Sequence, residues 1–144
     1  MIIKLSLDML FCFCASFFYA LIMNSPRKIL PYTAFIASLG YLIYILCINN
    51  GIPKLGFLLG TGAVTFLGEI FARKFKMPAT IFIFPSLIPI VPGWGLYQTM
   101  YAVVQNDIFA ALETGANTIV NIGAMAVAMA VVGLFTSKLK FNKN

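Results

Sequence analysis

The chain has 144 residues, of which 61% are hydrophobic and only 10% are charged. Soluble domains carry roughly 25% charged residues, so this composition excludes an ordinary soluble enzyme or binding domain. The net charge of +6 comes from short basic clusters between apolar runs. Such clusters are typical of membrane orientation signals and not of the continuous basic face that binds nucleic acid.

Nearly all of the chain consists of apolar segments long enough, at roughly 20 residues each, to cross about 30 Å of hydrocarbon. We expect about five spans, separated by polar turns, at residues 5–23, 29–48, 55–72, 78–104 and 114–135. The first is interpreted as a retained span and not as a signal peptide, because no small-residue cleavage site follows it. The stretch from Asp107 to Glu113 is expected to form a short interfacial helix. The sequence therefore predicts an all-α integral membrane protein with a single transmembrane domain over residues 1–144.

The basic residues predict the orientation of this domain. With five spans, the first loop, the third loop and the C-terminus share one side, and they hold eight of the ten Lys and Arg residues. These eight are Arg27, Lys28, Arg73, Lys74, Lys76, Lys138, Lys140 and Lys143. Because basic loops stay inside, the C-terminus is expected in the cytoplasm and the N-terminus outside.

The fourth span is the segment most suggestive of a binding site. Pro85, Pro89 and Pro92 fall within eight residues, and Gly93 and Gly95 follow. Prolines remove backbone donors and clash with the preceding turn, so we expect the helix to be broken here. Non-helical backbone at membrane depth must be buried in protein or line a cavity, and such breaks form substrate sites in transporters. The alternative is a structural kink that binds nothing.

The third span carries an ionisable pair. Glu69 lies about one turn inside the span, and Arg73 follows four residues later on the same helix face. A charge inside a span suggests function. The alternative interpretation is an interfacial carboxylate that is paired permanently with Arg73. Asp8 lies nearer a membrane surface and is interpreted as a solvated end residue.

Two further patterns concern helix packing. Gly56 and Gly60 form a GxxxG pair in the third span, and the fifth span is also rich in Gly and Ala. We therefore expect both spans to be buried in protein. Asn117 and Asn121 are four residues apart on the fifth span, with Thr114 and Thr118 alongside. This polar stripe either binds a substrate or hydrogen-bonds between helices. The chain has no His and no CxxC pair, so neither a metal site nor a cofactor is expected.

The stretch from Gly68 to Tyr101 resembles the C-terminal half of the threonine/serine exporter family. The resemblance is carried by Gly68-Glu69-Ile70-Phe71-Ala72-Arg73-Lys74, by Met77-Pro78, and by Ile88-Pro89-Ile90-Val91-Pro92-Gly93 followed by Tyr97. The chain length resembles the small, separately encoded subunit of the two-component members, the YjjB type. Trp94 is bulkier than the residue expected after the glycine.

The resemblance implies a multi-pass exporter subunit of the bacterial cytoplasmic (inner) membrane that works with a larger partner subunit. The implied substrates are threonine and serine, or small carboxylates, moved with the proton gradient as driving force. We expect the substrate to contact residues of the broken span and the polar stripe, and Glu69 and Arg73 to act in coupling. The candidate substrate-binding residues are Pro89, Pro92, Gly93, Trp94, Tyr97, Gln98, Asn117 and Asn121.

The alternative to a transporter subunit is a structural or assembly subunit of a membrane complex, possessing no transport activity. A membrane enzyme is not expected, because the chain lacks the His, paired Asp or HExxH patterns that such enzymes use. The broken span favours a transporter subunit over an assembly subunit, because an assembly subunit has no need of three prolines at the membrane midplane.

Overall fold

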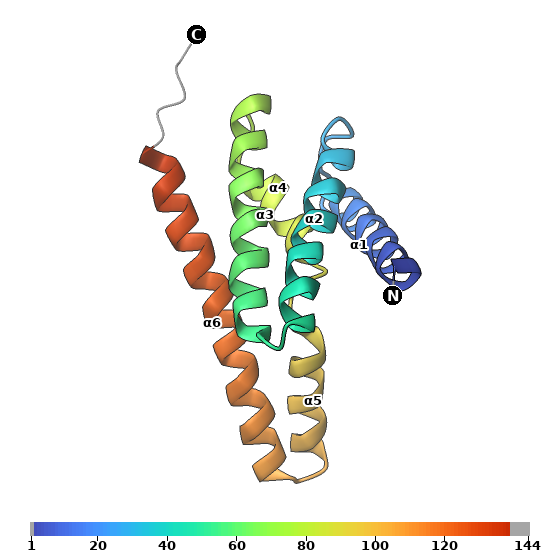
Figure 1. Ribbon diagram of the computed structural model, residues 1–144, viewed down its shortest axis with the longest axis vertical. Helices are drawn as coiled ribbons and strands as arrows, with labels where there is room; N and C mark the ends of the chain where they lie inside the picture. Colours follow the sequence, from blue (N-terminus) through green and yellow to red (C-terminus); the bar gives the residue numbers. More distant parts are fainter. Residues whose placement is uncertain (1, 139–144) are drawn as a thin grey trace.

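The computed structural model describes residues 2–138, and this part of the chain is helical throughout apart from short connections (Figure 1). The helices are α1 (Ile2–Ile22), α2 (Leu30–Asn49), α3 (Pro53–Phe75), α4 (Thr80–Leu87), α5 (Gly93–Val104) and α6 (Ile108–Lys138). The predicted all-α fold is confirmed. Lys140 and Lys143 of the basic tail lie outside the described residues.

Helices α1, α2, α3 and α6 are each long and apolar enough to cross a membrane. The fourth predicted span is divided into α4, with 8 residues, and α5, with 12 residues. The break predicted from the prolines is therefore confirmed and lies at residues 88–92. Pro89 and Pro92 have no N–H, so the carbonyls of Pro85 and Ile88 cannot receive the helical hydrogen bond that would continue α4.

The expectation of a separate interfacial helix after Asp107 is wrong. Helix α6 begins at Ile108 and continues for 31 residues without interruption. Asp107 caps its start, because its Oδ1 accepts a hydrogen bond from the Ala110 N–H at 3.1 Å. At 1.5 Å per residue α6 is about 46 Å long, which exceeds the roughly 30 Å hydrocarbon thickness of a bilayer.

Helices α2 and α3 form a closely packed antiparallel hairpin. A Cβ placed on Gly60 would lie 3.1 Å from the Gly40 carbonyl oxygen, and one on Gly56 would lie 3.1 Å from the Tyr44 carbonyl oxygen. Cβ contacts this short are rare, so glycine at these two positions favours the close approach of the two backbones. Helix α3 also contacts α4 and α6, so its predicted burial in protein is confirmed.

The described chain covers the fifth span only in part, through contacts of α6 with α3 and α5. Helix α6 exposes Ile119 and Leu134, at 71% and 69%. A Cβ on Gly123 or Gly133 would meet nothing within 4 Å. Within the described chain, the small residues of α6 are therefore not all used for packing.

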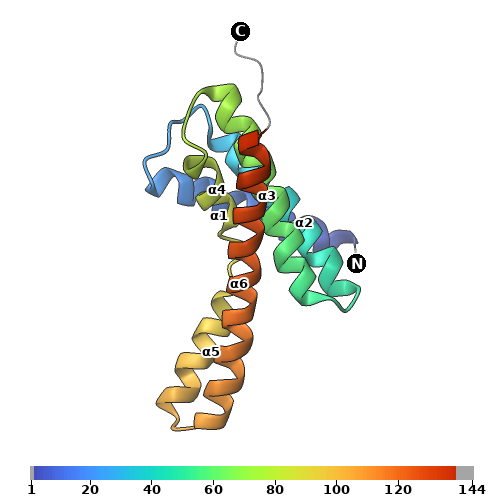
Figure 2. The same cartoon turned by 90° about the vertical axis from the view of Figure 1, so that its left-hand side faces the viewer.

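The helices are arranged as a bundle with one projecting arm. The α1–α2 turn, the end of α3 and the end of α6 lie toward the same end of the molecule, and these segments carry the basic clusters (Figures 1 and 2). The α5–α6 hairpin extends past the α2–α3 turn and diverges from it. Helix α1 crosses the bundle obliquely (Figure 2).

Candidate functional site around the interrupted helix

The break between α4 and α5 is docked in protein. Ile90, in the middle of the break, is 1% exposed. Its Cδ1 would lie 3.2 Å from a Cβ on Gly40 and 3.5 Å from one on Gly60. The Ile90 side chain therefore lies where α2 and α3 approach closely. A side chain at Gly40 would crowd Ile90, whereas the distance from Gly60 is an ordinary van der Waals contact.

The N-terminal side of the break is held by hydrogen bonds to α2. The Ser86 hydroxyl is buried and lies 2.8 Å from the Thr33 carbonyl oxygen and 2.7 Å from the Phe82 carbonyl oxygen. Phe82 is fully buried one turn earlier in α4. Helix α4 is thus fixed against α2 up to the residue where the prolines end it.

A small pocket opens beside the break. Its volume is about 250 Å³, and it is lined by Asp8 and Cys12 of α1, Tyr41 of α2, and Pro89 of the break, together with Phe11 and Ala15. Pro89 is the one candidate site residue that lines this pocket. The pocket brings a carboxylate, a phenol and the interrupted backbone together from three parts of the chain.

Asp8, interpreted from the sequence as a solvated end residue, is partly exposed but does not lie beside an end of α2. The Ser38 hydroxyl of α2 donates to the Met9 carbonyl of α1 at 3.2 Å, which places this part of α1 beside the central turns of α2. Tyr41 lies about 12 Å before the end of the roughly 30 Å helix α2. Asp8 is therefore at the depth of mid-α2, because α1 crosses obliquely.

The sequence of α1 does contain a pattern that indicates which side of the helix faces the pocket. Asp8, Cys12 and Ser16 are spaced by four residues and so share one face of a helix that is otherwise bulky and apolar. Ser16 is fully buried, and its hydroxyl has no hydrogen-bond partner among the described residues. A polar face on an apolar span marks the side that contacts protein.

The candidate residues on α5 lie mainly on its outer face. Trp94 and Tyr97 are 73% and 58% exposed, and their ring centroids are 5.6 Å apart. Tyr101 continues this row one turn later, with its ring 6.1 Å from that of Tyr97. Pro92 caps α5, and Gly93 is exposed at its first position. Gln98 is partly buried.

Helix α5 packs against α6 through the predicted polar stripe. A Cβ on Gly95 would collide with the Thr118 hydroxyl, and the Thr99 hydroxyl lies 3.3 Å from that of Thr114. The threonines of the stripe therefore serve helix packing. Asn117 is exposed and Asn121 is partly buried. Neither asparagine lines the pocket beside Pro89.

Glu69 and Arg73 form an ion pair away from that pocket. The Arg73 Nη2 and Glu69 Oε2 atoms are 3.6 Å apart, and the two side chains are 31% and 24% exposed. The Arg73 guanidinium also donates to the Thr136 carbonyl at 2.5 Å. The pair thus links the end of α3 to the end of α6, near the basic end of the bundle.

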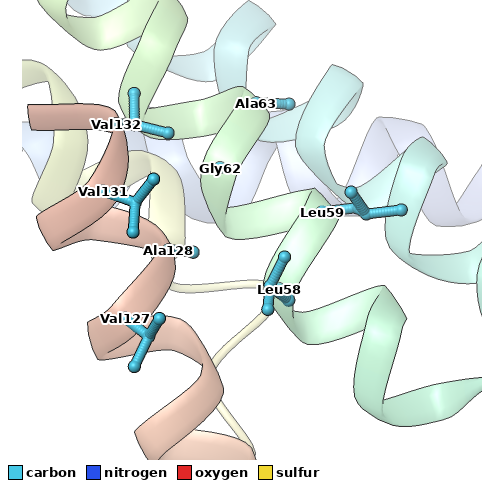
Figure 3. A pocket seen from close by; sticks show the side chains of 8 residues that line it. All are labelled: Leu58, Leu59, Gly62, Ala63, Val127, Ala128, Val131 and Val132. Carbon is cyan, nitrogen blue, oxygen red and sulfur yellow. The ribbon is translucent and has the colours of Figure 1, made fainter. Parts of the chain in front are cut away.

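A second groove, between α3 and α6, has different chemistry. It has a volume of about 320 Å³ and is lined only by Gly, Ala, Val and Leu, among them Gly62, Ala63 and Val131 (Figure 3). A groove without polar groups suits an acyl chain or an apolar helix and offers nothing to a polar solute.

These features define a multi-pass α-helical membrane protein in which one interrupted span is packed among continuous helices. The chain belongs to the threonine/serine exporter (ThrE) family, whose sequence profile matches residues 8–135. The resemblance seen in the motifs of the third and fourth spans is thereby confirmed, and members of this family are transporters.

One relative also informs the question of chain organisation. An uncharacterised protein of Haemophilus influenzae is 29% identical over 147 aligned residues, which cover 96% of this chain and 50% of that protein. The chain therefore spans about half the length of this curated relative. No solved structure shows a significant match to the chain.

Proposed function

We propose that the chain is the membrane subunit of a secondary exporter for small amino acids such as threonine and serine, or for small carboxylates. The observation that carries this proposal is the α4–α5 break, which is docked between α2 and α3 by the buried Ile90. Broken helices packed in this way hold the substrate sites of secondary transporters. The candidate substrate-binding residues are those predicted from the sequence, with the break from Pro89 to Gly93 at their centre.

The exporter is proposed to include a larger partner subunit. Among the described helices, α5 contacts α6 alone, and the hairpin that they form exposes Val104 and Phe109 at 76% and 87%. Helix α6 is longer than the hydrocarbon core of a bilayer is thick. When α3 spans the bilayer, part of α6 therefore extends beyond the lipid. The chain also matches half of its curated relative. A membrane subunit corresponding to the other half would cover this hairpin.

Coupling is proposed to use the proton gradient and the Glu69–Arg73 pair. A proton on Glu69 would remove the charge that holds Arg73, and Arg73 also contacts the end of α6. The pair could thus connect protonation to movement between α3 and α6. The proposed orientation in the bacterial cytoplasmic membrane has the N-terminus outside and the basic end of the bundle in the cytoplasm, which reporter fusions at both ends would test.

Export from cells tests the function. The gene is deleted from its host, the cells are loaded with a threonine-containing dipeptide, and intracellular and external threonine are measured over time. Cells lacking the chain should retain threonine, and the wild-type gene should restore its release. Release that is unchanged by the deletion, for threonine, serine and succinate alike, would contradict the proposal.

A variant that favours a continuous helix across the α4–α5 break distinguishes a transporter subunit from an assembly subunit. Replacing Pro89 and Pro92 together by Ala restores the missing N–H groups and favours a continuous helix. We expect this double variant to reach the membrane and bind its partner but to export about tenfold more slowly. Pro31→Ala is the matched control, since Pro31 is exposed in the first turn of α2. Export at the control rate would favour an assembly role.

A further inference from the structure

Asp8 is a partly exposed carboxylate on the side of α1 that faces α2 and the break. It has no ion-pair or hydrogen-bond partner among the residues that the structure describes, where the one ion pair within 4 Å is Glu69–Arg73. It lies at the depth of mid-α2, beside Tyr41. Charged side chains at membrane depth are costly and normally pair with another charge or face a binding site. The carboxylate of Asp8 is therefore available to pair with a positively charged group from outside the chain.

The surroundings of Asp8 suit a small solute. The pocket is open to the surface, and its volume of about 250 Å³ is just below the usual range of ligand pockets, roughly 300–1,000 Å³. Tyr41 supplies a hydroxyl that can donate or accept. Pro89 brings the break to the pocket. Carboxylate and hydroxyl oxygens are both acceptors for an ammonium group.

We propose that the pocket formed by Asp8, Tyr41 and Pro89 binds the ammonium group of a small zwitterionic solute, with Asp8 as its counter-charge. This inference rests on the proposed function and narrows its substrate class. Asp8 is the one acidic side chain that lines the pocket, and a carboxylate attracts an ammonium group and repels a dicarboxylate. The proposal therefore favours small amino acids over small carboxylates as the exported solutes.

Transport by inverted membrane vesicles that contain the chain and its partner provides the first test. Serine, glycerate and succinate are compared, because glycerate replaces the ammonium group of serine with a hydroxyl. We expect wild-type vesicles to transport serine in preference to both acids. Asp8→Asn should raise the KM for serine on the order of tenfold, with a smaller effect on kcat, since a charge-assisted hydrogen bond is lost. Tyr41→Phe should raise it less.

The matched control is Asp107→Asn. Asp107 is an exposed carboxylate at the start of α6, and Asn caps a helix about as well as Asp. The control should keep the wild-type KM. A KM for serine that is unchanged in Asp8→Asn, or succinate transport that equals serine transport in the wild type, would overturn the proposal.

A labelling experiment tests the pocket without depending on transport. Cys12, Cys14 and Cys47 are replaced by Ser, and Ala15, which is exposed and lines the pocket, is replaced by Cys. In membranes, a cationic methanethiosulfonate should label this residue faster than an anionic one, and Asp8→Asn should remove the preference. Serine, and not glycerate, should slow the labelling.

Asn50→Cys, in the exposed α2–α3 turn, is the control for labelling and should show no effect of Asp8→Asn or of serine. If the chain exports serine but serine does not protect position 15, the pocket proposal is wrong and the proposed function stands. If no solute is transported, yet serine protects position 15, the ammonium site stands and the exporter function is wrong. Equal labelling by both reagents, without protection, overturns the site.

Discussion

At the residue scale, the two acidic side chains within the bundle differ in what surrounds them. Glu69 is 3.6 Å from Arg73 on its own helix, whereas Asp8 has no such partner among the described residues. A paired carboxylate can act as a releasable contact, and an unpaired one can act as a counter-charge for a bound solute. The same type of side chain is thus suited to two different tasks.

We predict that Glu69→Gln keeps insertion and partner binding but removes the pH dependence of export. Glutamine preserves size and hydrogen bonding while abolishing the charge that holds Arg73. Export into media of different pH measures the effect, and Glu113→Gln, at an exposed position on α6, is the control. Wild-type rate and wild-type pH dependence in Glu69→Gln would exclude Glu69 from coupling and leave it as a helix anchor.

At the element scale, the interrupted helix depends on the glycines of its neighbours. Prolines end α4, but they do not determine where the freed segment goes. A Cβ on Gly40 would collide with Val64 and lie 3.2 Å from the Ile90 Cδ1, so the missing side chain of Gly40 leaves room for both between α2 and α3. The break and the α2–α3 contact are therefore one packing unit.

We predict that Gly60→Ala destabilises the protein by about 1–3 kcal/mol, the usual cost of overpacking a tight contact. The new methyl group would lie 3.1 Å from the Gly40 carbonyl oxygen, which is backbone and cannot rotate away. Unfolding in mixed detergent micelles measures the free energy. Gly133→Ala should be close to neutral, because its Cβ meets nothing within 4 Å. Equal stability of both variants would show that the α2–α3 contact is looser than described.

At the scale of the whole molecule, the α5–α6 hairpin is the part least supported by the rest of the chain. It projects past the α2–α3 turn (Figure 1) and exposes a row of aromatic rings at Trp94, Tyr97 and Tyr101. Helix α5 contacts only α6 among the described helices, so this row of rings faces either lipid or a partner subunit.

We predict that a photo-crosslinking residue at Phe109 captures the partner subunit in native membranes. Phe109 is 87% exposed on the hairpin, and Phe18, at 60% on α1, is the control that should crosslink mainly to lipid. Mass spectrometry of the products identifies what each position contacts. Capture at Phe18 but not at Phe109 would place the partner on the opposite side of the bundle.

The sequence by itself determined the membrane class, the helical segments and the place of the break. These follow from local properties: apolar runs of sufficient length, turn residues between them, and prolines that cannot donate hydrogen bonds. The family resemblance also lay in a contiguous stretch of motifs. The continuity of α6 through Glu113 was missed, because the cap at Asp107 is a weak local signal beside a polar turn.

Only the tertiary structure decided which side chains meet. The sequence suggested that Asp8 lies near a membrane surface, because its distance from the start of the chain was taken as its depth in the membrane. The oblique crossing of α1 makes this distance and this depth differ. Tyr41 and Pro89 are 48 residues apart in the sequence, and their approach depends on how Ile90 packs against Gly40. Pairing of helices in a membrane rests on close contact and not on hydrophobicity, which every span shares. The composition of each span therefore cannot specify its neighbours, and the pocket exists only in the assembled bundle.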